Sequence, residues 1–364
     1  MTNEPVAPAD VDAFAERIFG AVLGAQLVQS IDLGDRLGWY RSLAADGPAT
    51  SPELAARTGS AERYAREWLE QQAACGVLTV DDAGLGPTER RFTLPPAHAA
   101  VLADRDSTGF MTPIARFVTA SGRFIDRIAE TYRTGDGLGW AELGDEAREA
   151  QAAANRPLFL QRLTQELLPA APEVHARLQR AGRIADVGCG YGWSSIGLAR
   201  GYPHVTVDGY DVDEPSVVAS RHNAAETGVD DRVSFHAGDV GALGDDHAGA
   251  YDAVFAFECV HDMPDPVSVL AAMGRMVAAD GVVVVMDERT EDRFCAPAGE
   301  VEQLLYGYSL MCCLGDGLSQ QPSVETGTVM RPDTFTAYAQ AAGFASVDVL
   351  PIEDDFFRFY LLRH

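Results

Sequence analysis

Two groups of residues in the carboxy-terminal half of the chain have types and spacing suited to chemistry. The first is the run Asp186-Val187-Gly188-Cys189-Gly190-Tyr191-Gly192, which follows a strand-like segment at 183–185 and precedes a helix start. Glycines let the backbone turn tightly and approach a ligand closely, and the start of a helix offers unpaired N–H donors. A strand, a glycine-rich turn and a helix in this order predict a nucleotide-binding corner.

The spacing of the glycines narrows the class of nucleotide. A phosphate-binding loop needs Gly-Lys-Ser/Thr, and the chain has no lysine; the third glycine of the dinucleotide pattern would stand where Trp193 is. An acidic residue heads the run instead. The run resembles the first motif of the class I S-adenosylmethionine-dependent methyltransferases, whose cofactor has no phosphate but carries an ammonium and a sulfonium, which an acidic, glycine-lined turn suits. This resemblance implies S-adenosylmethionine as the cofactor, held in part by Asp186, Gly188, Gly190 and Gly192.

The second group is His261-Asp262, with Asp287-Glu288 further along the chain. Methyl transfer from a sulfonium requires that the acceptor be positioned and lose its proton, and a histidine of ordinary pKa suits that task. The segment resembles the His-Asp-Trp-Ser-Asp motif of plant-type O-methyltransferases, although Met263 and Pro264 replace the Trp and the Ser. The resemblance implies His261 as general base, oriented by Asp287 or Glu288. A His that only packs or caps at this corner is the alternative.

Seven strand-like segments must position these groups. They are 183–185, 205–211, 233–239, 251–257, 281–286, 346–350 and 356–362, with helical segments between most of them. Asp211 ends the second strand, where a carboxylate can accept hydrogen bonds from both ribose hydroxyls. The resemblance also implies Asp239 near the adenine, with Val240 and Phe257 in the cofactor site. The fold class is therefore α/β, a seven-stranded Rossmann-like methyltransferase domain over residues 181–364.

The amino-terminal part predicts a second, mostly helical domain over residues 1–105. An apolar periodic helix at 11–33 precedes two short helices, capped by Ser51 and Ser60, and two strands at 77–80 and 91–94. Helices followed by a hairpin indicate a winged helix, which in the small-molecule O-methyltransferase family mediates dimerisation. The resemblance implies a homodimer through this domain, and residues 106–180 are expected to be helical and to roof the acceptor pocket.

Composition excludes several classes of partner. The chain carries 28 basic and 54 acidic residues, for a net charge of −26. This charge argues against nucleic acid and against an anionic membrane surface. No segment has the length and apolarity of a membrane helix, and residues 1–10 lack a signal pattern, so a cytoplasmic location is expected. Six cysteines without paired spacing predict free thiols, with the adjacent Cys312 and Cys313 in the core. No metal is expected. A metal site built from two histidines would need a partner for His261 further along the chain, and the next histidine is the terminal His364.

We therefore expect a methyltransferase that acts on a small molecule of secondary metabolism. Oxygen is the favoured acceptor atom, with nitrogen or carbon possible. Aromatic and methionine side chains after the fifth strand suit a planar or apolar acceptor; they are Tyr306, Tyr308, Met311, Met330, Phe356 and Phe357. The alternative function is a ligand-responsive transcriptional regulator with a winged helix. The segment that would enter the DNA groove carries more acidic than basic residues, which disfavours that alternative.

Overall fold

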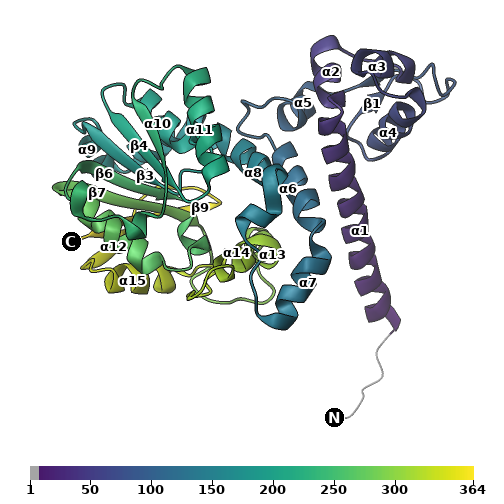
Figure 1. The fold of residues 1–364 in the computed structure, drawn as a ribbon. Coiled ribbons are helices and arrows are strands. Elements are labelled where there is room, and N and C mark those ends of the chain that lie inside the picture. Colours follow the sequence, from purple (N-terminus) through teal and green to yellow (C-terminus); the bar gives the residue numbers. More distant parts are fainter. Residues whose placement is uncertain (1–7) are drawn as a thin grey trace, which may run out of the picture. The chain divides into compact units, whose positions relative to one another are not determined.

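The computed structural model describes residues 8–364 and divides the chain into two compact units, Met1–Ala120 and Ser121–His364 (Figure 1). Residues 1–7, most of the segment inspected for a signal pattern, lie outside the described residues. No helix of the described part combines the length and the apolar character that a membrane span requires.

The amino-terminal unit consists of helices and one short hairpin. Its strands pair antiparallel, with Thr79 opposite Thr93, and its core contains Trp39, Tyr40 and Trp68. Helices followed by a hairpin confirm the predicted winged helix. The elements are α1 (Pro8–Arg36), α2 (Trp39–Asp46), α3 (Ser51–Thr58), α4 (Glu62–Ala74), β1 (Thr79–Val80), β2 (Phe92–Thr93), α5 (Pro96–Leu102) and α6 (Thr112–Gly122), the last of which crosses the unit boundary.

The two helix caps predicted in this unit are wrong by one residue each. Thr50, not Ser51, caps α3, because its extended backbone lets its side chain accept from the N–H of Glu53 while the Glu53 carboxylate accepts from the N–H of Thr50. Ala61 precedes α4 and has no side-chain cap. The Ser60 hydroxyl instead accepts from the indole N–H of Trp39, at 3.2 Å.

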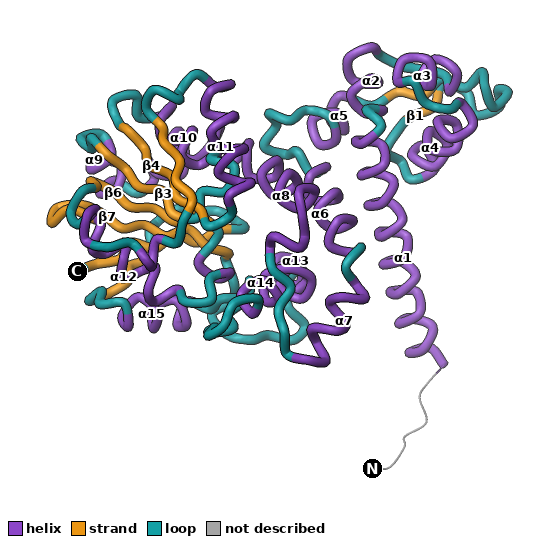
Figure 2. Tube along the Cα trace, in the orientation of Figure 1, coloured by secondary structure: helices purple, strands orange, loops and turns teal. Residues whose placement is uncertain are grey.

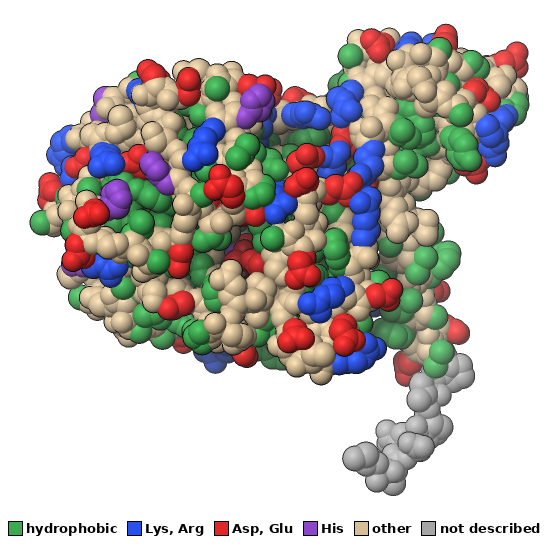
Figure 3. Space-filling model, in the orientation of Figure 1, with side chains coloured by type: hydrophobic (Ala, Val, Ile, Leu, Met, Phe, Trp, Pro, Cys, Tyr) green, Lys and Arg blue, Asp and Glu red, His purple; other side chains and the backbone are tan. Residues whose placement is uncertain are grey.

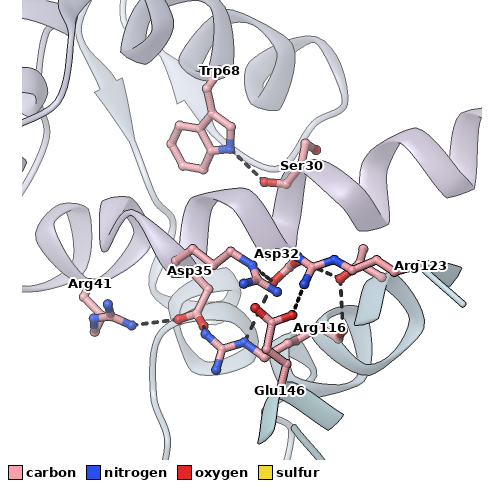
Figure 4. Close-up of polar contacts among 10 residues, drawn as sticks. Ser30, Asp32, Asp35, Arg41, Trp68, Arg116, Arg123 and Glu146 are labelled. Atoms are coloured by element: carbon pink, nitrogen blue, oxygen red, sulfur yellow. Dashed lines mark hydrogen bonds and ion pairs between the residues drawn. The ribbon is translucent and has the colours of Figure 1, made fainter. Parts of the chain in front are cut away.

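Buried charges hold the carboxy-terminal half of α1 within its unit (Figure 4). Asp32 and Asp35 are both buried, and Arg116 of α6 pairs with Asp35 at 3.1 Å. Arg41 pairs with Asp35 from the other side at 2.7 Å. Removing one partner of such a pair would leave a buried charge uncompensated. This half of α1 is therefore fixed by specific contacts, and the preceding half is not part of that network.

The carboxy-terminal unit contains a seven-stranded sheet with helices on both of its faces (Figure 2). The strand order is β5-β4-β3-β6-β7-β9-β8, and only β9 runs antiparallel to its neighbours. This confirms the predicted seven-stranded Rossmann-like fold. The strands are β3 (Arg183–Val187), β4 (Thr206–Asp211), β5 (Val233–Ala237), β6 (Tyr251–Phe257), β7 (Val277–Glu288), β8 (Ser346–Val349) and β9 (Phe357–Arg363).

Two apolar cores lie against the two faces of this sheet. One includes Ile184 of β3 with Leu198 and Val217 from helices on one face, and the other includes Leu270 and Phe335 from helices on the opposite face. Strands buried on both faces explain the long apolar runs of the sequence. The helices are α7 (Ile125–Thr134), α8 (Trp140–Pro157), α9 (Pro172–Leu178), α10 (Trp193–Gly201), α11 (Glu214–Thr227), α12 (Pro266–Met276), α13 (Glu300–Tyr308), α14 (Leu314–Leu318) and α15 (Pro332–Ala341), with π-helical segments at Leu158–Leu167 and Ser309–Cys313.

Candidate active site

The glycine-rich turn between β3 and α10 has the backbone that its sequence predicts. Gly188, Gly190 and Gly192 all have positive φ, at 70°, 51° and 79°, a region that side chains with a Cβ disfavour. A Cβ on Gly188 would lie 2.6 Å from the sulfur of Cys259, so close packing also requires glycine there. A Cβ on Gly190 would meet no atom within 4 Å. The turn is therefore closely packed at Gly188 and Gly192 and open at Gly190.

Asp211 meets this turn from the end of β4. Its carboxylate accepts from the N–H of Gly190 at 2.7 Å and from the N–H of Asp213 at 2.9 Å. Burial raises the pKa of Asp211, which the backbone N–H donors oppose. The structure thus places the Asp211 carboxylate, which is predicted to accept hydrogen bonds from the ribose hydroxyls, beside the glycine turn.

Asp186 points elsewhere. One carboxylate oxygen accepts from the hydroxyls of Ser194 and Ser195, at 2.6 and 2.5 Å, and the other oxygen has no hydrogen-bond partner among the described residues. Burial raises the pKa of Asp186 to about 6. Its visible contacts therefore fix the start of α10, and any contact with a cofactor stays a prediction.

The remaining predicted cofactor residues lie at the ends of β5 and β6. Asp239 is exposed and caps a short turn by accepting from the N–H of Gly241 at 2.8 Å. Val240 and Phe257 are buried in the cores on the two faces of the sheet. These residues supply packing and one exposed carboxylate, and their roles toward a cofactor stay predictions.

His261 follows β6 and is almost completely buried, at 2% exposure. Its Nδ1 lies 2.8 Å from an Asp287 carboxylate oxygen and 2.9 Å from one of Glu288, both at the end of β7. Its Nε2 lies 3.3 Å from an Asp262 carboxylate oxygen. The structure therefore brings together His261, Asp287 and Glu288, and Asp287 makes the hydrogen bond that would orient the ring. We call Glu258, His261, Asp262, Asp287 and Glu288 the His261 cluster.

The cluster shifts the protonation equilibrium of its own members. Burial lowers the pKa of His261, but the charges of Asp262, Glu288 and Asp287 outweigh burial and raise the pKa well above its usual range. Burial raises the pKa of Glu288 well above its usual range, while its attraction to His261 opposes this. The pKa of Asp287 is lowered, because burial is outweighed by its attraction to and hydrogen bond with His261. An imidazolium paired with ionised Asp287 is the resting state that these shifts favour.

Glu258 is a member of the cluster for which the sequence analysis predicts no role. It follows Phe257 directly and has a φ of 51°, which is uncommon for a residue other than glycine. Its carboxylate accepts a hydrogen bond from the side-chain amide of Asn155 in α8. Burial raises the pKa of Glu258 to about 8. One signal in the sequence could have indicated this role for Glu258. Its carboxyl group directly follows a buried strand and lies close in sequence to the pair His261-Asp262.

Cys313 also belongs to the surroundings of this cluster, which corrects the prediction that both adjacent cysteines lie in the core. Cys312 is buried, but Cys313 is only half-buried, and its sulfur lies within 4.8 Å of an Asp262 carboxylate oxygen. The π-helical segment at Ser309–Cys313 accounts for this placement, since it changes the direction of side chains relative to an α-helix. Among the described residues, two groups have metal-ligand spacing, and both contain His261; Asp262 and Cys313 complete one, and Asp287 and Glu288 the other. The absence of a metal stays a prediction.

Comparison with known proteins agrees with the fold of both units. Residues 178–320 match a family model described as a methyltransferase domain, and residues 25–104 match the Rv2258c-like winged HTH domain. Ubiquinone biosynthesis O-methyltransferases are 40% identical over 102 residues in Shewanella pealeana and 36% identical over 115 residues in Marinobacter nauticus. These matches cover 28% and 31% of this chain, and 41% and 47% of those enzymes. The chain therefore spans less than half the length of these relatives.

Solved structures resemble the chain along nearly all of its length. The mitomycin 7-O-methyltransferase MmcR has a TM-score of 0.71 at 22% identity, covering 98% of this chain and 100% of that one. Human N-acetylserotonin methyltransferase, solved in complex with SAM, has a TM-score of 0.70 at 16% identity, covering 100% and 99%. At these identities the likeness establishes the fold.

The fold and the family models together define the class of the protein. The chain combines a winged helix-turn-helix domain with a methyltransferase domain of the Rossmann-like type. The sequence-based expectation of a class I methyltransferase domain behind a winged-helix domain is thereby confirmed.

The electrostatics of the cluster can be tested without a substrate. Replacing Asp287 with Asn should lower the pKa of His261 by about one unit or more, because it removes a buried charge 2.8 Å from the ring. Nuclear magnetic resonance titration of the labelled histidine ring measures this pKa. Glu226→Gln, which removes the carboxylate beside the exposed His222, is the control and should leave His261 unchanged. An unchanged His261 pKa in Asp287→Asn would show that the carboxylate does not hold the ring's charge.

Proposed function

We propose that the protein transfers the methyl group of S-adenosylmethionine to a small-molecule acceptor, with oxygen as the favoured acceptor atom. One observation carries this proposal. The glycine turn bound to Asp211 and the buried His261 paired with Asp287 lie at the carboxyl ends of neighbouring parallel strands. Ligands of open α/β sheets bind at such an edge, where the strand order reverses.

The residues at this edge fit the proposed cofactor. The open side of Gly190 admits close approach, and Asp211 supplies a carboxylate for the ribose hydroxyls. Gly188, Gly192 and Asp186 shape the turn, and Asp239, Val240 and Phe257 lie at the ends of the next strands, where the adenine is expected. When bound, S-adenosylmethionine supplies a methyl group on a sulfonium, which is an excellent leaving group. The protein's own task is to orient the acceptor and remove its proton.

We assign the proton removal to His261. Its Nδ1 is engaged by Asp287, with Glu288 beside it, so Nε2 is the nitrogen that can accept a proton from the acceptor. An acceptor hydroxyl must therefore reach the position near Nε2 where the Asp262 carboxylate now lies. Only the neutral ring is a base, and the raised pKa of His261 makes that form more abundant as pH rises above neutrality.

The acceptor is proposed to be a planar or apolar product of secondary metabolism, with N- or C-methylation as alternatives. Tyr308 of α13 supports an aromatic lining, because it lies close to Glu258 and Cys313 beside the His261 cluster. MmcR, by its name, methylates mitomycin, which is consistent with this class of acceptor. The cytoplasm is the proposed location, where the six free cysteines would stay reduced.

We propose in addition that the protein is a homodimer through its amino-terminal unit. The amino-terminal half of α1 exposes large apolar side chains on a helix that the rest of its unit does not cover, and such surface usually marks an interface. The exposed fractions range from 50% to 64% for Val11, Phe14, Ile18, Phe19, Val22 and Leu23.

A transcriptional regulator is the competing function, since the family model of the amino-terminal domain is a winged HTH domain. The contacts of α4 oppose DNA binding by this helix. Arg63 pairs with Glu67, and Arg66 pairs with Glu62, so both arginines are matched by carboxylates on the same helix. With the chain's net charge of −26, phosphate binding by this helix is unfavourable. A mobility-shift assay separates the two functions.

Asp211 provides the first test of the cofactor. Asp211→Ala should weaken S-adenosylmethionine binding by roughly 10- to 100-fold, because hydrogen bonds to a charged acceptor are lost. Isothermal calorimetry measures this, with Asp230→Ala as a control that removes an exposed carboxylate. Asp211→Asn, which keeps one acceptor oxygen for the N–H of Gly190, should lose less. Equal affinity in wild type and Asp211→Ala would refute the assigned ribose site.

The dimer is tested by placing charge on the exposed face of α1. The double variant Phe14→Asp, Ile18→Asp should be monomeric at micromolar concentration, because burying two carboxylates opposes association. Light scattering measures the mass. Val218→Asp, an exposed apolar position on α11, should leave the dimer intact. A wild-type protein that is already a monomer at this concentration rules out the proposal.

The role of His261 is tested by turnover. His261→Ala should reduce turnover by about 10²–10⁴-fold and leave cofactor affinity nearly unchanged, because the base acts in the transition state. In the wild type, turnover should keep rising with pH above neutrality, since the raised pKa of His261 delays formation of the neutral ring. That rise should be absent in the variant. Wild-type turnover in His261→Ala from pH 6 to 9 would mean that the histidine is structural.

A further inference from the structure

Arg148 is a buried cation beside the predicted cofactor site. It lies in α8, which is interrupted at Gly144, where the backbone has a φ of 77°, and the helical segment after this break carries Arg148. Its side chain is only 6% exposed, and its guanidinium donates two hydrogen bonds to the carboxylate of Asp213, at 2.8 and 2.9 Å. Two parallel hydrogen bonds between a guanidinium and a carboxylate fix the relative position of both groups. They therefore anchor α8 to the turn that follows β4.

Asp213 passes this constraint on to Asp211. Its N–H donates to the Asp211 carboxylate at 2.9 Å, and its own carboxylate accepts from the N–H and the hydroxyl of Ser216, at 3.0 and 2.6 Å. Two hydrogen bonds from Arg148 and two from Ser216 fill the acceptor sites of the Asp213 carboxylate. The side chain of Asp213 is therefore not available to a ligand, and its contacts instead fix the backbone that orients Asp211.

The same turn brings two carboxylates close together in acidic surroundings. Burial raises the pKa of Asp211, and the charge of Asp213 adds to this effect. Burial also acts to raise the pKa of Asp213, but the hydrogen bonds from Arg148 and Ser216 outweigh burial and lower that pKa. Acidic side chains are recessed in the middle of this face of the carboxy-terminal unit (Figure 3). Arg148 therefore neutralises a carboxylate that would otherwise repel Asp211 in its charged form.

Two further side chains of α8 contact the segments that follow neighbouring strands. The guanidinium of Arg156 lies over the ring of Trp193, 5.1 Å from its centroid, directly after the glycine turn that follows β3. The amide of Asn155 donates to the carboxylate of Glu258, which follows β6. One helix thus contacts the segments after β4, β3 and β6, and Arg148 supplies its contact with the segment after β4.

We propose that Arg148 is a positioning residue of the cofactor site, which holds the Asp211 carboxylate in place for the ribose hydroxyls through Asp213. This inference rests on the proposed function, since it assumes that the ribose of S-adenosylmethionine binds at Asp211. Arg148 acts without touching the cofactor. Its effect should therefore be confined to the part of the binding affinity that the ribose hydroxyls contribute.

The experiment uses two ligands that differ only at the ribose, S-adenosylhomocysteine and its analogue without the 2′ and 3′ hydroxyls. Calorimetry on the full chain measures both affinities. The wild type should bind S-adenosylhomocysteine roughly 10- to 100-fold more tightly than the analogue, because the analogue lacks the hydrogen bonds to a charged acceptor. Arg148→Gln should lower this ratio by roughly 3- to 30-fold, as expected within one hydrogen-bond network, and should leave the affinity for the analogue nearly unchanged.

Three comparisons separate positioning from a general loss of structure. Arg148→Lys keeps the buried positive charge but not the planar two-bond contact, so it should fold and give an intermediate ratio. Arg177→Gln is the matched control and should keep the wild-type ratio, because Arg177 pairs with Asp252 at 2.6 Å near the start of β6, at the opposite edge of the sheet. In an Asp211→Ala background, Arg148→Gln should have little further effect, since it acts through that carboxylate.

Each outcome decides the proposal. A wild-type ratio in both Arg148 variants would overturn it, and so would equal weakening of both ligands, since Arg148 would then be merely structural. A wild type that binds the two ligands equally would overturn it without any variant, because Asp211 would then make no contact with the ribose hydroxyls. Failure of the wild type to bind either ligand would refute the proposed function instead, so the two failures are distinguishable.

Discussion

Val187 of β3 lies in register with Tyr210 of β4 on one side and Ala256 of β6 on the other. This parallel pairing is the constraint on which the site depends, because it brings the ends of three strands to one edge of the sheet. The glycine turn follows β3, Asp211 ends β4, and His261 follows β6, while Asp287 and Glu288 come from the end of β7, the next strand of the sheet. The connections from β3 and β6 lead to helices on opposite faces, and ligands of open α/β sheets bind where the connections diverge in this way. Local turns then set the details, such as the N–H of Gly190 on Asp211.

An excess of buried carboxyl groups gives this edge its chemical character. They stabilise the imidazolium of His261, which raises its pKa and makes the neutral ring a stronger but scarcer base at neutral pH. The same carboxyl groups favour a cationic cofactor. The positive charge of a sulfonium can balance negative charge on the carboxylates, which otherwise is neutralised when they bind protons. Binding of the cofactor and protonation of the cluster are therefore expected to be coupled. The cost is that stabilising the sulfonium favours the ground state as well as the transition state.

The sequence predicts the parts of this structure that depend on local patterns. Glycine at 188, 190 and 192 and the apolar run of β7 each have one simple structural explanation, and both predictions are confirmed. Prediction fails where several backbone choices are close in energy, as at the cap of α3, which lies at Thr50. It also fails where distant segments converge. The hydrogen bond from Asn155 to Glu258 spans 103 residues, and no periodicity in the sequence indicates it.

The central claim is that the cofactor and the general base meet at the edge between β3 and β6. A crystal structure of the protein with bound S-adenosylhomocysteine tests this most directly. The account predicts that the ribose hydroxyls lie within hydrogen-bond distance of Asp211 and that the sulfur points toward His261. A nucleoside bound away from the glycine turn, or bound with its adenine at His261, would contradict it.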